Sequence, residues 1–133
     1  MKKKLLSAIA VMLLLLLCLT GCGKYSSSYR AVGFVHSNDS RSAFMNFHSF
    51  EGTMVFTLKY SGSSGTQIKY SAKLEDGSAK VYYDNGGEKT ELFSVKSGDD
   101  ISSAGGDLSE GTVYIIVETG GTCKNGEIRF EIG

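Results

Sequence analysis

The stretch TMVFTLKY at residues 53–60 decides the fold class, because large apolar side chains occupy every second position in it. These side chains are Met54, Phe56, Leu58 and Tyr60. In a β-strand, alternate side chains point to opposite faces, so this spacing places all four on one face. The stretch therefore predicts a strand with one buried face.

The same two-residue period recurs along the chain. Residues 66–74 and 127–132 alternate cleanly, whereas residues 112–118 are almost continuously apolar. This pattern is typical of a strand covered on both faces, or of one covered on one face with Tyr114 and Ile116 under a neighbouring segment. Further strands are predicted over residues 29–36, 43–50, 79–83 and 89–95. Turns are predicted at residues 61–65, at 75–77, at 123–126 and at Asp84-Asn85-Gly86-Gly87, whose residues tolerate positive φ.

No segment has a sustained helical period, and the turn signals recur at the spacing of all-β proteins. Eight or nine strands that each have one apolar face need a second layer to cover that face. The predicted fold is therefore an all-β, two-sheet antiparallel β-sandwich of jelly-roll type. At 133 residues, the chain holds one such domain.

The N-terminal segment has the features of an export signal. Lysines occupy positions 2–4, and residues 5–19 form an apolar run interrupted only by Ser7. The sequence Leu19-Thr20-Gly21-Cys22 follows and resembles the lipobox of bacterial lipoproteins. This resemblance implies cleavage before Cys22, attachment of lipid to its thiol, and acyl chains that anchor the protein to the bacterial membrane or outer envelope on its extracytoplasmic side.

The resulting organisation is a cleaved signal peptide at residues 1–21, a lipid-anchored tether at 22–28 and a β-sandwich domain at 29–133. Cleavage removes Cys18 and lipid occupies Cys22, so Cys123 is left as the single thiol and no internal disulfide is expected. The mature chain has 11 basic and 14 acidic side chains, which disfavours nucleic acid as a partner.

The body also resembles the bacterial pre-peptidase C-terminal domain, a small β-sandwich found on secreted enzymes. The similarity rests on residues 81–87 (VYYDNGG), residues 111–118 (GTVYIIVE) and Asn125-Gly126 before the last strand. The resemblance implies the fold and no activity. Members often have an Asp-x-Asp associated with calcium where this chain has Gly77-Ser78-Ala79-Lys80, so no calcium site is carried over to this position.

Candidate site residues are few. Tyr83 and Tyr114, with Tyr29 as a further candidate, are predicted to present aromatic rings to a ligand. The acidic residues Asp99, Asp100, Asp107 and Glu110 fall in a segment read as a Gly/Ser-rich loop. A solvated loop explains them without a cofactor, and a calcium site is the alternative. His36 and His48 are the only histidines, and no catalytic motif surrounds them.

These observations predict a non-enzymatic, lipid-anchored module that binds or adheres to protein or glycan. The first alternative is a structural accessory subunit of an envelope complex, with a neighbouring protein paired at a sheet edge. The second is a small hydrolase or metal-dependent enzyme.

Overall fold

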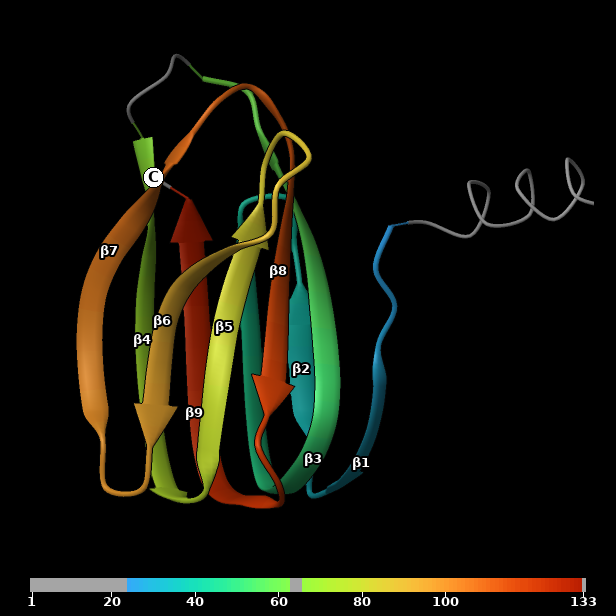
Figure 1. The fold of residues 1–133 in the computed structure, drawn as a ribbon, viewed down its shortest axis with the longest axis vertical. Coiled ribbons are helices and arrows are strands. Elements are labelled where there is room, and N and C mark those ends of the chain that lie inside the picture. Colours follow the sequence, from blue (N-terminus) through green and yellow to red (C-terminus); the bar gives the residue numbers. More distant parts are fainter. Residues whose placement is uncertain (1–23, 63–65, 133) are drawn as a thin grey trace, which may run out of the picture.

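The computed structural model describes residues 24–62 and 66–132, and most of them are in β-strands (Figure 1). The nine strands are β1 (Ser28–Val32), β2 (Val35–Asn38), β3 (Ser42–Tyr60), β4 (Thr66–Asp76), β5 (Ser78–Asp84), β6 (Thr90–Lys96), β7 (Asp100–Leu108), β8 (Gly111–Thr119) and β9 (Cys123–Ile132). The described ranges hold no helix long and apolar enough to cross a membrane. The all-β prediction is confirmed.

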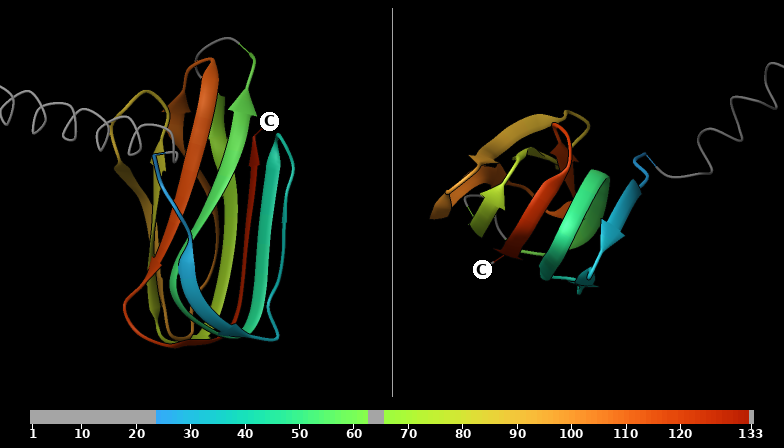
Figure 2. Two further views of the ribbon diagram at one scale, coloured as in Figure 1. Left: turned by 90° about the vertical axis from the view of Figure 1, so that its right-hand side faces the viewer. Right: turned by 90° about the horizontal axis from the view of Figure 1, so that it is seen from below.

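All strand pairs are antiparallel, and β3 links two layers (Figures 1 and 2). Its first half lies in a layer ordered β2-β3-β9-β4-β7, and its second half lies in a layer ordered β3-β8-β5-β6. Between the halves the strand turns at Gly52, whose φ is 129°. A Cβ at Gly52 would overlap the Ser28 carbonyl oxygen, so only glycine fits there.

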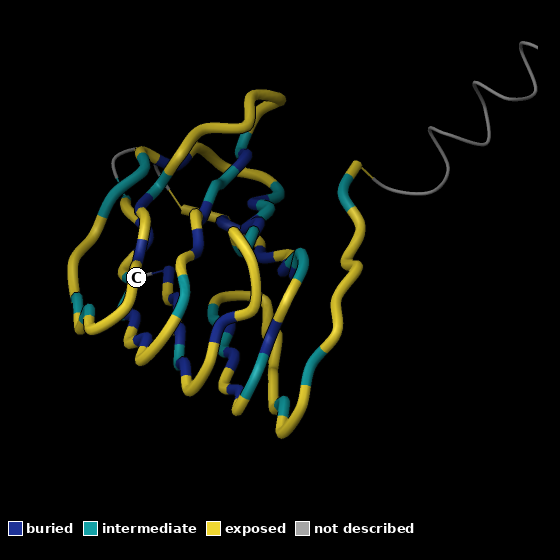
Figure 3. The backbone as a smooth tube through the Cα atoms, turned by 60° about the horizontal axis from the view of Figure 1, so that its bottom comes forward, coloured by how far each residue is buried: buried dark blue, intermediate teal, exposed yellow. Residues whose placement is uncertain are grey.

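The core lies between the layers, and burial alternates along the strands (Figure 3). Met54, Phe56, Leu58 and Tyr60 are all buried, as the opening stretch predicted. Contacts such as Phe56 to Phe130, with ring centroids 6.0 Å apart, join the two layers. Asn38, at the end of β2, joins the first layer to the second half of β3. Its side-chain amide accepts from the Thr57 N–H and donates to the Thr57 carbonyl, both at 2.9 Å.

Two predicted connections are strands in the structure. The segment read as an acidic loop is mostly β7, and the predicted turn at residues 123–126 lies inside β9. Both predictions were wrong for the same physical reason. The glycines in these segments leave room for aromatic rings that pack against the strand, whereas the prediction took them as signs of a turn. A Cβ at Gly106 would lie 2.9 Å from the ring of Tyr83, and one at Gly126 would overlap the ring of Phe47.

Strand boundaries differ from the prediction at the start of the domain. Residues 29–36 divide into β1 and β2, because Gly33 adopts a φ of 59° between them. Residues 43–50 and 53–60, predicted as separate strands, are continuous in β3. The turn at Gly52 changes the layer without ending the strand.

Candidate functional site

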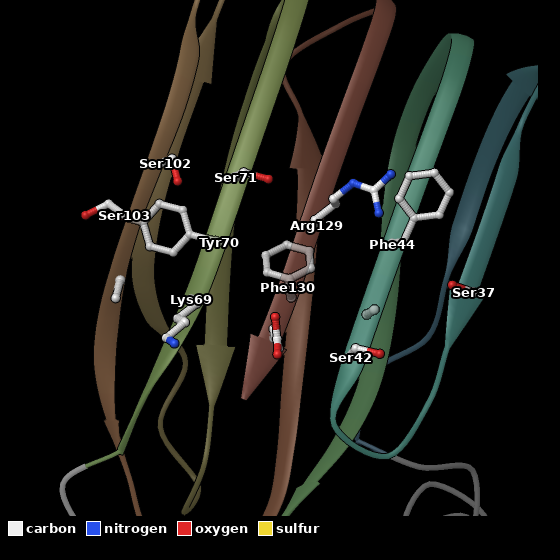
Figure 4. A pocket seen from close by; sticks show the side chains of 13 residues that line it. Ser37, Ser42, Phe44, Lys69, Tyr70, Ser71, Ser102, Ser103, Arg129 and Phe130 are labelled. Carbon is white, nitrogen blue, oxygen red and sulfur yellow. The ribbon is translucent and has the colours of Figure 1, made fainter. Parts of the chain in front are cut away.

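The outer surface of the β2-β3-β9-β4-β7 layer carries a hollow of about 710 Å³ (Figure 4). We call the outward-facing side chains of this layer the polar face. One row of the polar face crosses all five strands in register and consists of Ser37, Phe44, Arg129, Ser71 and Ser102. With about 4.8 Å between neighbouring strands, the row spans about 19 Å.

Arg129 and Phe44 form the centre of this row. The Arg129 guanidinium carbon lies 4.4 Å from the centroid of the Phe44 ring, and Figure 4 shows the two side chains together over β9 and β3. Arg129 Nε donates to Glu127 Oε1 at 2.7 Å, which fixes the guanidinium over the ring. The pair makes a planar platform with donors at its edge.

A second row borders the platform. It contains Ser42, Glu131, Lys69 and Ala104, which lie opposite one another on β3, β9, β4 and β7. Lys69 and Glu131 have opposite charges, and Glu127 already balances Arg129. The hollow therefore combines hydroxyl groups with balanced charges, which matches a neutral ligand that offers both hydrogen-bond donors and acceptors.

Further along the polar face, three side chains form a chain of hydrogen bonds. His48 Nδ1 lies 3.0 Å from Asn125 Oδ1, and the Asn125 amide donates to Glu75 Oε2 at 2.7 Å. Asn125 has a φ of 50°, a conformation that asparagine tolerates better than most residues. The polar face therefore continues beyond the hollow along β3, β9 and β4.

The predicted aromatic residues lie elsewhere. Tyr83 is half-buried, and its ring packs on the backbone of Gly106. Tyr114 is half-buried and meets the edge of Tyr25, with ring centroids 5.4 Å apart. Tyr29 is 41% exposed and stacks on Phe50. None of the three lines the hollow.

The acidic candidates are not brought together by the structure. Asp100 begins β7 and Asp107 lies near its end, so seven residues of strand place about 23 Å between them. Asp99 accepts the backbone N–H of Lys96 at 2.9 Å, and Asp100 lies 3.8 Å from the ammonium of Lys73. Residues 24–62 and 66–132 contain no group of three or more side chains arranged to hold a metal ion.

Cys123 and the histidines form no catalytic arrangement in the described part of the chain. The Cys123 side chain is fully buried, and its thiol donates to the Ser78 carbonyl at 3.3 Å. Burial raises the pKa of this thiol. The His36 ring lies 4.8 Å from that of Phe34, and His48 pairs with Asn125. Cys123 is therefore a buried core residue that packs as a small apolar side chain.

A second polar centre surrounds Asp84, which is only 2% exposed. Its carboxylate accepts from Lys24 Nζ and the Tyr25 hydroxyl, both at 2.7 Å, and from the Gly87 N–H at 2.8 Å. Desolvation by itself would raise the pKa of Asp84, but these hydrogen bonds and the charge of Lys24 outweigh it and lower the pKa to about 2. Burial, with the bond to Asp84 and its charge, raises the pKa of Tyr25 to about 12.

Sequence reasoning identified the outward direction of Arg129 from the alternation in residues 127–132, but not its partner. Phe44 lies in a stretch where four apolar residues follow no single period. The signal that locates the site is the register between β3 and β9, which places Phe44 opposite Arg129. Register is set by tertiary pairing, so periodicity within one strand does not reveal it.

No protein-family model matches this chain, and no curated protein is similar to it in sequence. Among solved structures, it is similar to a family 29 carbohydrate-binding module complexed with mannohexaose, at 16% identity over 81% of this chain and 90% of that one, with a TM-score of 0.41.

A structure described as CBM4 matches at 13% identity over 86% and 81% of the two chains, with a TM-score of 0.40. A module from Cellvibrio mixtus lichenase 5A in complex with cellotriose matches at 16% identity over 77% and 88%, with a TM-score of 0.39. Likeness at this distance assigns neither a family nor a ligand, so the function of this chain has to be inferred from its own residues.

Proposed function

We propose that this chain is a lipid-anchored, non-catalytic module that binds a neutral glycan across the polar face. The observation that carries the proposal is the row of five side chains in register, with the stacked Phe44–Arg129 platform at its centre. A sugar ring has an apolar face that packs on a planar group and hydroxyls that both donate and accept hydrogen bonds. The row offers both features side by side.

The charge pattern favours a neutral ligand over an anionic one. In the hollow, Arg129 is paired with Glu127 at 2.7 Å and Lys69 lies opposite Glu131 in register. An anionic polymer would meet the carboxylates of Glu127 and Glu131 as well as the two cations. A neutral chain of hydroxyl groups meets no such repulsion and uses every serine of the row.

Affinity gel electrophoresis of the full chain tests the glycan proposal. Soluble glucan, mannan and xylan serve as neutral probes, and polygalacturonate serves as the anionic probe. We expect at least one neutral polysaccharide to retard the wild type, and Phe44→Ala and Arg129→Ala each to lower its affinity about tenfold, the effect of losing about 1.4 kcal/mol.

Arg30→Ala is the matched control, because Arg30 is an exposed arginine on β1 outside the hollow. It should bind like the wild type, and thermal unfolding should show that all variants are folded. Absence of retardation by every neutral probe, or equal binding by Arg129→Ala and Arg30→Ala, would contradict the glycan proposal.

The lipid anchor rests on the sequence Leu19-Thr20-Gly21-Cys22, which lies outside the described residues. Intact mass and membrane fractionation of the chain made in a bacterial host, beside Cys22→Ala, test it. A mature chain that begins at Cys22 and carries lipid, with lipid lost in the variant, is the expected result. An unmodified wild-type chain in the soluble fraction would refute the anchor.

A further inference from the structure

Residues 24–28, which we call the strap, lie against the body. The Tyr25 hydroxyl and the Lys24 ammonium each bond to Asp84 Oδ2 at 2.7 Å. The Tyr25 ring also meets Tyr114 on β8 edge to face, with 5.4 Å between ring centroids. The strap is therefore part of the folded body as far as Lys24.

The strap also completes the outer surface of the second layer. Ser27 Oγ accepts the backbone N–H of Val55 at 2.9 Å. Ile116 faces outward opposite Val55 and is nevertheless only 1% exposed. The apolar outer side of β8 explains why residues 112–118 are nearly continuously apolar, as the sequence indicated for a strand covered on both faces.

Without the strap, the buried carboxylate of Asp84 would lack most of its hydrogen-bond partners. Among residues 24–62 and 66–132, the body contributes the Gly87 N–H to this carboxylate, and the cation and the hydroxyl both come from the strap. A buried carboxylate with no cation is strongly disfavoured. The docked strap is therefore the stable arrangement of this corner.

This docking places the body relative to Cys22. Two peptide units separate Cys22 from Lys24, and a fully extended chain covers at most about 7 Å over that length. We infer that the strap holds one end of the sandwich, formed by the β5–β6 hairpin and the β7–β8 turn, against the lipid headgroups of the membrane that anchors the chain. The inference rests on the anchor part of the proposed function.

The residues at that end of the sandwich are suited to contact with lipid headgroups without insertion into the bilayer. Its hollow of about 260 Å³ is lined mainly by small or polar residues, among them Asn85, Gly87 and Glu110, together with the half-buried Tyr114. Among the described residues, the exposed large hydrophobics are Tyr29, Val32 and Val35, on β1 and β2. Figure 1 shows the β1–β2 connection at the end opposite the β5–β6 hairpin. In this orientation the polar face lies along the side of the sandwich and does not contact the bilayer.

Trypsin release from membranes tests the docking. The full chain is reconstituted in vesicles of phosphatidylethanolamine and phosphatidylglycerol, and cleavage after Lys24 frees a soluble body that begins at Tyr25. Proteases cleave undocked segments, so the wild type should resist. Tyr25→Ala and Asp84→Asn should each release more than about tenfold faster, because a hydrogen bond to a charged group is lost in both and Tyr25→Ala also loses the ring contact with Tyr114.

Two features of the variants control this assay. Asp84→Asn leaves the cleavage sequence unaltered, and Ser26→Ala changes an exposed strap residue and should resist like the wild type. If the wild type is released as fast as Tyr25→Ala, the docked strap is refuted. The cleavage products are identified by mass, so the docking result holds even for a chain that carries no lipid.

Energy transfer tests the orientation. A dye on Glu88→Cys, in the β5–β6 hairpin, should transfer energy to a headgroup-labelled lipid more strongly than a dye on Gly121→Cys, in the β8–β9 turn at the opposite end. Tyr25→Ala should reduce this difference. Equal transfer from both positions in the wild type would overturn the inference, whereas a chain that fails to bind vesicles refutes the anchor instead.

Discussion

Removing one oxygen atom from the strap, in Tyr25→Phe, should weaken its docking by a predictable amount. The phenol hydroxyl donates to Asp84 Oδ2 at 2.7 Å, and the ring contact with Tyr114 is kept. A hydrogen bond to a charged group contributes about 1.5–3 kcal/mol. Since Asp84 keeps Lys24 and Gly87, we take the lower bound of about 1.5 kcal/mol, which corresponds to roughly twelvefold more frequent opening.

The backbone amide of Val55 reports this opening directly, because it donates to Ser27 Oγ in the strap at 2.9 Å. Thr57 lies on the same edge of β3, but its amide donates to Asn38 Oδ1 and does not depend on the strap. Hydrogen exchange resolved to single amides should therefore show Val55 exchanging about tenfold faster in Tyr25→Phe, with Thr57 unchanged.

Two outcomes would refute this reasoning. If the exchange of Val55 does not change, the bond from Tyr25 to Asp84 does not hold the strap. If Val55 and Thr57 accelerate equally, the substitution has destabilised the whole body, and the docking would not be a separate local equilibrium. Ser26→Ala again serves as the matched control in the same segment.

The packing and the pKa values predict further outcomes. Gly126→Ala should lower the free energy of unfolding by about 1–3 kcal/mol through overpacking in thermal denaturation, whereas Gly121→Ala, with open space around it, should have little effect. Spectrophotometric titration should find Tyr25 ionising near pH 12, and in Asp84→Asn its pKa should fall toward 10; no change would contradict the bond between them. Because its folded pKa is lowered to about 2, Asp84 should stabilise the docked strap above about pH 4 and lose this effect as the pH falls toward 2. Cys123 should resist maleimide in the native chain at pH 7 and react after unfolding, and rapid native labelling would show that it is accessible.

The local sequence pattern was sufficient to predict most of the strands. Residues 53–60, 66–74 and 127–132 each have a clean two-residue period, and the structure buries their predicted faces, with Tyr70 only partly buried. Such a period is a property of the strand alone, because alternate side chains point to opposite sides whatever the partner is. The hairpin turn predicted at residues 84–87 is local in the same way, although the structure joins β5 to β6 through a longer connection, residues 85–89.

Glycine-rich segments were misread because glycine has two uses. At residues 84–87 it allows positive φ in a turn, whereas Gly126 makes room for the ring of Phe47. Gly106 does both, with a φ of 72° beside the ring of Tyr83. Which use applies depends on what packs against the glycine. The rings come from distant parts of the chain, so a local window contains no record of them.

The sequence by itself determined the all-β class and the faces of the regular strands, and it predicts the export and lipid-anchoring signals, because all of these depend on residues that are neighbours in the chain. Tertiary structure alone decided the candidate site. Phe44 and Arg129 become a platform through the register of β3 with β9, and Asp84 becomes a receptor because Tyr25, 59 positions away, folds onto it. Both arrangements depend on pairing between distant segments, which the period of a single strand does not encode.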